Sequence, residues 1–331
     1  MQRPTRRLLL GTLTTLGALA SGLAITAPAL AAEAAWPSKP IRIVVPYTPG
    51  GTSDIIARVI SQAISDAFKQ PVVVENKPGA NGNAGTELVA KSPADGYTLL
   101  LCDVGALAIS PSVYNKLSFD PSKDVRGVAM LAYSPHLLVV HPSVPANNLK
   151  ELAALSKTTP LNFAVTALGS APHLAGLAVE AGSGAKRTYI TYKGGSQAIQ
   201  DTIGGQTQVL MNGMLATLPH VQSGKLKVLG VSRATRSPLL PDAPTIAEQG
   251  LQGFESGSWQ GVLAPAGTPP AVMARLAAEL TRIIRSPEVR ARLTAQGAEV
   301  YTMSPTEFTA FYEKERVKWA AVVAKAGVKL D

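Results

Sequence analysis

The alternation of short apolar runs with helical patterns constrains this fold more than any other feature of the sequence. Residues 41–46 form a β-branched run, and residues 55–68 follow with their apolar side chains on one helical face. The same strand pattern returns at residues 72–75, 98–102, 137–140, 162–165, 188–192, 209–211 and 227–231. Helical stretches lie between most of these runs, which predicts an α/β protein with parallel sheets.

The carboxy-terminal segment has a different pattern, in which three hydroxyl–proline pairs recur. The pairs are Thr268-Pro269, Ser286-Pro287 and Ser304-Pro305. Each places a capping hydroxyl before a proline at the first helical position. Ser304 and Glu307 also have the spacing of a capping box. We therefore predict three successive helices here.

The amino terminus has the pattern of an export signal. Residues 1–7 contain three arginines and no acid, and residues 8–26 are uncharged and mostly apolar. Residues 27–31 then place alanines two positions apart, as cleavage requires. We expect a signal peptide over residues 1–31 that is removed on export; a permanent membrane anchor is the lesser alternative. The paired Arg6-Arg7 leaves both the twin-arginine and the general export route open.

Charge and cysteine content limit the possible partners. Without residues 1–31 the chain keeps 28 Lys and Arg against 22 Asp and Glu, a net charge of +6. These basic residues are scattered and do not alternate with aromatic residues, so we do not predict binding to nucleic acid. Such a surface attracts anions. The single cysteine, Cys102, lies in an apolar run and is interpreted as a core thiol.

Glycine-rich junctions are the strongest functional signal. Five of them follow predicted strands, at residues 47–54, 77–85, 103–106, 166–170 and 193–196. Glycine lets the backbone approach a ligand, and the first N–H groups of a helix favour an anion. One such loop alone is ordinary strand-to-helix capping, but five loops at the same ends of parallel strands predict an anion-binding crevice. Asp54 would repel an anion, so we expect it to cap its loop from beneath.

Catalytic chemistry receives little support from the residues. Ser170 and His173 are one helical turn apart and could form a nucleophile with its base, but an N-cap serine and a packing histidine are favoured. The glycines at positions 79, 82 and 85 do not have the dinucleotide-binding spacing. The other histidines have no metal-ligand spacing: His136, His141 and His220. We predict no catalytic residue, metal or cofactor and keep a secreted enzyme as the alternative.

Several blocks of the sequence resemble one family. Residues 36–54, 74–80 and 94–100 are similar to the Bug family of tripartite tricarboxylate transporter receptors. Further similar blocks follow in the family's order at residues 192–195, 204–206, 219–220, 224–227, 240–245 and 264–269. The resemblance covers essentially the whole chain after residue 31.

The resemblance implies a type II periplasmic binding-protein fold, with two α/β lobes and a ligand cleft between them. We expect residues 32–131 plus 258–331 to form lobe 1 and residues 132–257 to form lobe 2. Strands near residues 128–131 and 259–263 would cross between the lobes. The implied function is that of a monomeric periplasmic receptor, which captures a small organic carboxylate and delivers it to membrane transporter subunits. A receptor that reports its ligand to a sensor protein remains an alternative.

The resemblance also implies which residues contact the ligand. They are Tyr47, Thr48, Thr52 and Ser53 in lobe 1, and Gly169, Ser170, Gly195 and Ser196 in lobe 2, with Asn81 and Asn83 as weaker candidates. The sequence departs from the family pattern at two further cleft positions. Residues 103–106, which include Gly105, replace a Thr/Ser-rich turn, and Asn212 stands where an aspartate is frequent. Asn212 argues against an amino-acid ligand, whereas Asp103 could restore an acid from the other side.

Overall fold

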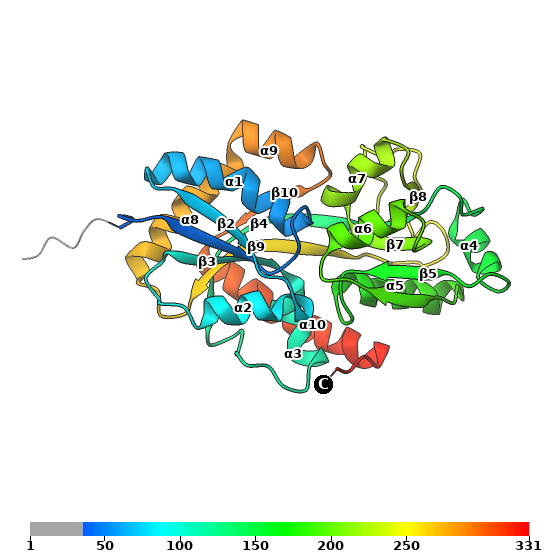
Figure 1. The fold of residues 1–331 in the computed structure, drawn as a ribbon, viewed down its shortest axis with the longest axis horizontal. Coiled ribbons are helices and arrows are strands. Elements are labelled where there is room, and N and C mark those ends of the chain that lie inside the picture. Colours follow the sequence, from blue (N-terminus) through cyan, green and yellow to red (C-terminus); the bar gives the residue numbers. More distant parts are fainter. Residues whose placement is uncertain (1–35, 331) are drawn as a thin grey trace, which may run out of the picture. The chain divides into compact units, whose positions relative to one another are not determined.

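Two β-sheets that share one long strand organise the fold (Figure 1). The computed structural model describes residues 36–330, so the predicted signal peptide lies outside the described residues. The first sheet runs in the order β2-β1-β3-β9-β4, with β10 also paired to β4. Its strands are β1 (Ile41–Val45), β2 (Val72–Asn76), β3 (Thr98–Asp103), β4 (Val125–Val140), β9 (Gly257–Pro265) and β10 (Glu299–Met303).

The second sheet contains the end of β4 and four shorter strands. They are β5 (Asn162–Val165), β6 (Thr188–Thr191), β7 (Val209–Gly213) and β8 (Lys227–Val231). β5 pairs in parallel with β6 and β7, whereas β4 pairs antiparallel with β7 and β8. β9 is also antiparallel to both β3 and β4. The prediction of parallel sheets was therefore wrong in part: both sheets are mixed.

Strand β4 connects the two sheets without a break. Its register along β9 ends where Pro135 faces Gly257, and its register along β7 begins where His136 faces Gly213. The sequence pattern predicted two separate runs here, because Ser134-Pro135 interrupts the apolar stretch. Proline cannot donate to a ladder, and it lies where the strand exchanges partners. The lobe boundary expected at residues 131/132 stays a prediction.

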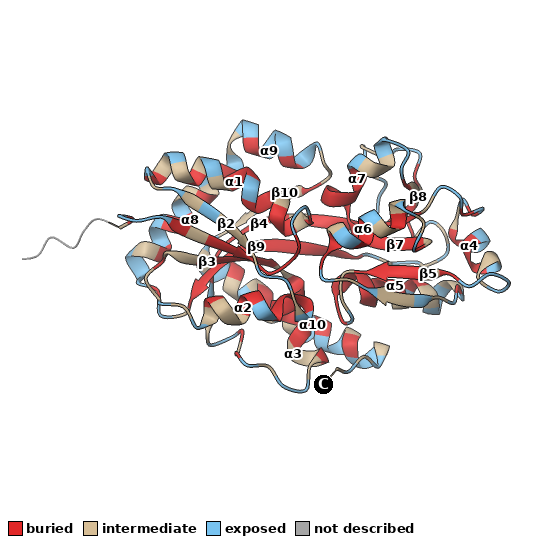
Figure 2. Cartoon of the chain, in the orientation of Figure 1, coloured by how far each residue is buried: buried red, intermediate tan, exposed pale blue. Residues whose placement is uncertain are grey.

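Helices cover both faces of each sheet. In the view of Figure 1, α1 and α9 lie above the first sheet and α2, α3 and α10 below it; α6 and α7 lie above the second sheet and α5 below it. Helix α8 packs against α1. Figure 2 shows the central strands buried between these layers, whereas β2, β6 and β10 contain no buried residue. None of the helices within residues 36–330 has the length and apolar character needed to cross a membrane. The helical segments are α1 (Thr52–Phe68), η1 (Ala80–Gly82), α2 (Asn83–Ala90), η2 (Gly105–Ile109), α3 (Ser110–Val113), α4 (Leu149–Leu155), α5 (Ala171–Ser183), α6 (Gly195–Ile203), α7 (Met214–Gln222), α8 (Pro270–Arg285), α9 (Pro287–Thr294) and α10 (Pro305–Ala326).

The predicted caps of the last three helices are confirmed in two cases. Ser286 caps α9, and Ser304 caps α10 in a capping box with Glu307. The prediction for Thr268 was wrong: α8 begins one residue later, at Pro270, and the Thr268 hydroxyl donates to the carbonyl of Pro265 at 2.7 Å. The three helices are also not successive, because β10 lies between α9 and α10.

Candidate ligand-binding site

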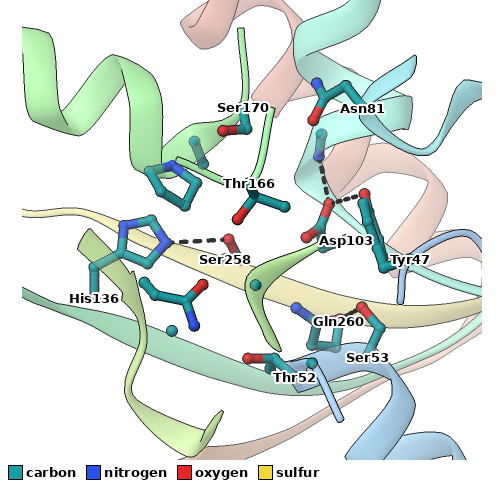
Figure 3. Close-up of a pocket in the computed structure, with 17 residues that line it drawn as sticks. Tyr47, Thr52, Ser53, Asn81, Asp103, His136, Thr166, Ser170, Ser258 and Gln260 are labelled. Carbon is teal, nitrogen blue, oxygen red and sulfur yellow. Dashed lines mark hydrogen bonds between the residues drawn. The ribbon is translucent and has the colours of Figure 1, made fainter. Parts of the chain in front are cut away.

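A cavity lies where the segments that follow β1, β2, β3, β5, β6 and β7 meet strands β4 and β9 (Figure 3). Its empty space, open solvent included, is about 500 Å³. The lining residues are Tyr47, Gly51, Thr52, Ser53, Asn81, Asp103, Gly105, His136, Thr166, Ser170, Ala171, Pro172, Gly195, Asn212, Gly213, Ser258 and Gln260. Both sheets therefore contribute to one cavity.

Four helices begin at the wall of this cavity. Gly51 is the N-cap of α1, Ser170 that of α5 and Gly213 that of α7, and Gly195 is the first residue of α6. Only α5 among these four has a side-chain cap on its first amides. The first N–H groups of a helix lack partners within the helix, and the helix dipole adds partial positive charge there. This wall is therefore suited to an anion.

No lysine or arginine is among the described residues that line the cavity. The ionisable side chains in the lining are Tyr47, Asp103 and His136. His136 is fully buried, with its ring nitrogens 2.8 Å from the Ser256 hydroxyl and 3.2 Å from the Ser258 hydroxyl. Burial lowers the pKa of His136 to about 3, so its ring is neutral near pH 7.

Asp103 and Tyr47 form a buried pair at one corner of the cavity. The Tyr47 hydroxyl donates to Asp103 Oδ1 at 2.5 Å, and the Gly105 amide donates to the same oxygen at 2.8 Å. Burial, followed by the Asp103 charge, raises the pKa of Tyr47 well above its ordinary value, so the phenol is neutral. Burial also raises the pKa of Asp103, although both hydrogen bonds act in the opposite direction.

Gln260 on β9 carries an unused donor. Its Oε1 accepts from the Ser53 hydroxyl at 2.6 Å. Its Nε2 is buried and has no hydrogen-bond partner among the described residues. A buried donor without a partner is costly, and here it belongs to a residue of the cavity wall. A ligand oxygen would satisfy it.

Asp54 lies beneath the first loop, as the sequence predicted. Its Oδ2 accepts from the Gly50 amide at 2.8 Å and from Arg58 Nε at 2.9 Å, and its Oδ1 accepts from Asn76 at 2.9 Å. Burial alone would raise the pKa of Asp54, but these hydrogen bonds lower it. The carboxylate holds the loop and does not line the cavity.

The structure brings most of the predicted contact residues together. Those that line the cavity are Tyr47, Thr52, Ser53, Asn81, Gly105, Ser170, Gly195 and Asn212. Those that do not are Thr48, Asn83, Gly169 and Ser196. The hydroxyls of Thr48 and Ser196 are 2.8 Å apart, and the Gly169 carbonyl accepts from Asn81 at 3.3 Å. Ligand contact stays a prediction for both groups.

Sequence reasoning missed the cavity residues that come from strands β4 and β9. His136 lies on β4, and Ser258 and Gln260 lie on β9. In the sequence, Ser258 and Gln260 alternate with Trp259 at the start of an apolar run, and this pattern was a signal that could have been used. Every residue of β9 is buried, so both polar side chains need hydrogen-bond partners. Thr166 and Asp103 were inside the predicted junctions but were not chosen as ligand contacts.

The proposed nucleophile and base do not form a catalytic pair. Ser170 caps α5, with its hydroxyl donating to the Ala167 carbonyl at 2.7 Å and accepting from the His173 amide at 3.4 Å. His173 Nδ1 accepts from the Gly169 amide at 3.0 Å, and burial lowers the pKa of His173 to about 4. The predicted capping and packing roles of Ser170 and His173 are confirmed.

Comparisons with known proteins agree with this architecture. The model of the tripartite tricarboxylate transporter family receptor matches residues 56–328. Protein BugT of Bordetella pertussis is 37% identical over 298 residues, which cover 89% of this chain and 91% of BugT. The periplasmic binding protein BugD has a similar structure, with 34% sequence identity and a TM-score of 0.85. The match covers 89% of this chain and 99% of the BugD chain.

Two similar structures carry carboxylates. An R. palustris protein with adipate is 34% identical, with a TM-score of 0.86, over 89% of this chain and 99% of its own. MatC from Rhodopseudomonas palustris, with bound malate, is 32% identical, with a TM-score of 0.82, over 87% of this chain and 99% of its own. The likeness establishes the α/β type II periplasmic binding-protein fold and a solute-binding role. This chain thus belongs to the tripartite tricarboxylate transporter receptor family, together with its Bug relatives.

Proposed function

We propose that this protein captures a small organic carboxylate in the cavity and delivers it to membrane transporter subunits of the tripartite tricarboxylate type. The observation that carries the proposal is the convergence of four helix starts on a cavity whose lining, within residues 36–330, contains no lysine or arginine. Family membership and the adipate and malate in similar structures support the ligand class. Export with loss of residues 1–31 and action as a monomer in the periplasm belong to the same proposal.

The carboxylate would be held by amides and hydroxyls and not by a salt bridge. Its oxygens would accept from the first amides of α1 and α6 and from Gln260 Nε2. The two lysines of the neighbouring loops lie elsewhere: Lys77 Nζ pairs with Glu75 at 2.7 Å, and Lys193 does not line the cavity. Closure around the ligand would bring Thr48 and Ser196 into the contact described above.

A thermal-shift screen of the protein without residues 1–31 tests the ligand class. The panel contains mono-, di- and tricarboxylates and aromatic acids. A ligand at about a hundred times its dissociation constant adds roughly 2.7 kcal/mol to the free energy of unfolding. Chromatography of the acid after incubation should recover it unchanged. Turnover that disappears in Ser170→Ala would favour an enzyme, and absence of any stabilising acid would contradict the proposal.

A pair of aspartate variants tests the helix-start mechanism. Ser170 and Ser286 are both serine N-caps, of α5 and α9, but only Ser170 lines the cavity. Aspartate is a good N-cap, so both Ser170→Asp and Ser286→Asp should fold. Ser170→Asp places a carboxylate at the anion site and should abolish binding measured by calorimetry, whereas Ser286→Asp should bind like the wild type. Loss of binding in Lys77→Ala or Lys193→Ala, with Ser170→Asp unaffected, would replace the mechanism by a lysine salt bridge.

Delivery requires its own measurement. Membrane vesicles that contain the transporter subunits should accumulate the radiolabelled acid only when the receptor is added. A receptor that binds the acid but supports no uptake would favour the reporting function over delivery.

A further inference from the structure

Asp103 is not explained by the binding of an anion alone. It lies in the lining of a cavity to which the described part of the chain contributes no lysine or arginine, and an ionised carboxylate there repels a second carboxylate. Asp103 is the last residue of β3 and faces the cavity from the strand end. A positively charged group on the ligand would relieve this repulsion.

The hydrogen bonds of Asp103 leave one oxygen free for such a partner. The Tyr47 hydroxyl and the Gly105 amide both donate to Oδ1, a pattern that stabilises the charged carboxylate. No hydrogen bond to Oδ2 from the described residues accompanies them. The second carboxylate oxygen is therefore available on the cavity side.

Asn81 adds a second acceptor to the same corner. Its Nδ2 donates to the Gly169 carbonyl at 3.3 Å and to the Ser110 hydroxyl at 3.4 Å, which turns the amide oxygen the other way. Figure 3 shows this oxygen on the side of Asp103. A Cβ added to Gly105 would lie 3.0 Å from both Asn81 Oδ1 and Asp103 Oδ1, so the two acceptors flank the same glycine.

The cavity is thus divided by its hydrogen-bonding groups. The helix starts and Gln260 Nε2 offer donors, whereas the corner of Asp103 and Asn81 offers acceptors. A protonated amine has three donors and no acceptor. We propose that Asp103 is a specificity-determining residue that selects carboxylates bearing a protonated amine, such as amino acids, over plain di- and tricarboxylates. This inference rests on the proposed function and names the ligand class of the same site.

Tyr47 is then a positioning residue. Its neutral hydroxyl occupies Oδ1 of Asp103 and so orients Oδ2 toward the ligand. Gly105 fixes the same oxygen from the backbone. Without the Tyr47 hydroxyl, the protein should discriminate less between an acid that bears an amine and its deaminated analogue, although the Asp103 charge is still present.

Matched acids that differ only in the amine test the inference by calorimetry. The pairs are aspartate with succinate, glutamate with glutarate, alanine with propanoate, and phenylalanine with 3-phenylpropanoate. In any pair whose members bind, the acid that bears the amine should bind about 30-fold or more tightly than its deaminated analogue, which is the factor expected for a buried charge pair. Malate, with a hydroxyl in place of the amine of aspartate, separates a need for positive charge from a need for any donor.

Three variants complete the experiment. Asp103→Asn should remove most of the preference for the amine, and Tyr47→Phe should reduce it by a smaller factor. Asp66→Asn, a surface carboxylate on α1, should leave the preference unchanged. Tighter binding of the deaminated acid by the wild type, tighter binding of malate than of aspartate, or an unchanged preference in Asp103→Asn would overturn the inference while leaving the proposed function intact. Failure of every acid to bind would contradict both.

Discussion

Replacement of Gly194 by alanine should block closure of the cleft without a change in the cavity lining. Gly194 is the N-cap of α6, and a Cβ built on it would lie 1.8 Å from Thr48 Oγ1 and 2.7 Å from the Thr48 backbone nitrogen. Rotation of the Thr48 side chain cannot relieve the contact with its backbone. Gly194 itself has extended dihedrals, φ 175° and ψ 160°, which alanine adopts freely. The clash therefore arises only from the approach of the two predicted lobes.

The magnitude follows from the contacts that the methyl group would separate. Thr48 and Ser196 are 2.8 Å apart through their hydroxyls, and Asn81 donates to the Gly169 carbonyl at 3.3 Å. Each hydrogen bond contributes about 0.5–1.5 kcal/mol, so the closed state would lose about 1–3 kcal/mol. Affinity should fall by about 5- to 150-fold. Calorimetry with the best acid of the screen measures this loss.

The control is Gly204→Ala at the other end of α6. A Cβ there would meet the amide end of the Gln206 side chain, its nearest backbone neighbour would be the Gln200 carbonyl at 3.5 Å, and φ is −77°. This variant should bind like the wild type, and circular dichroism should show both variants folded. Wild-type affinity in Gly194→Ala would refute the reasoning, because ligand binding would then not require the approach of Thr48 to α6.

Three further predictions concern stability, measured by urea unfolding. Burial lowers the pKa of His136 to about 3, below its unfolded value of 6.5. The stability that the neutral ring contributes is therefore present above pH 6.5 and decreases as the pH falls toward 3. Between pH 7 and pH 5, protonation of this residue should lower the free energy of unfolding by about 2 kcal/mol. A flat profile over that range would contradict the burial argument. Ser304→Ala removes the capping box of α10 and should cost about 1 kcal/mol. Phe308→Ala empties a fully buried position against Trp259 and should cost about 3–5 kcal/mol; a cost below 1 kcal/mol would show that the core collapses into the space.

Strands that are fixed by local pattern were predictable from the sequence. The bounds of β5 and β8 match the predicted runs at residues 162–165 and 227–231, and β1 differs from its run by one residue. In each case most positions carry β-branched or apolar side chains, so the local preference and the fold agree. The positions of α1, α5 and α6 after glycine-rich junctions were predictable for the same local reason.

Strands that are fixed by distant partners were not predictable. β10 has the mixed sequence Glu-Val-Tyr-Thr-Met, and none of its side chains is fully buried. It forms because Glu299 and Val300 pair with Tyr133 and Ala132 of β4, far away in the chain. The length of β4 has the same origin, since its ladder with β9 carries the strand through Pro135. Local propensity contains no information on either pairing.

The candidate site divides along the same line. Helix starts can be predicted from glycine and hydroxyl residues in the sequence. In contrast, His136, Ser258 and Gln260 line the cavity only because β4 and β9 pass through it. Their polar groups must be satisfied inside a buried strand pair. The His136 ring meets the hydroxyls of Ser256 and Ser258, but Gln260 Nε2 meets no described group. An oxygen of the proposed carboxylate would satisfy this buried and unpaired donor, so we expect Gln260 to contribute to its recognition.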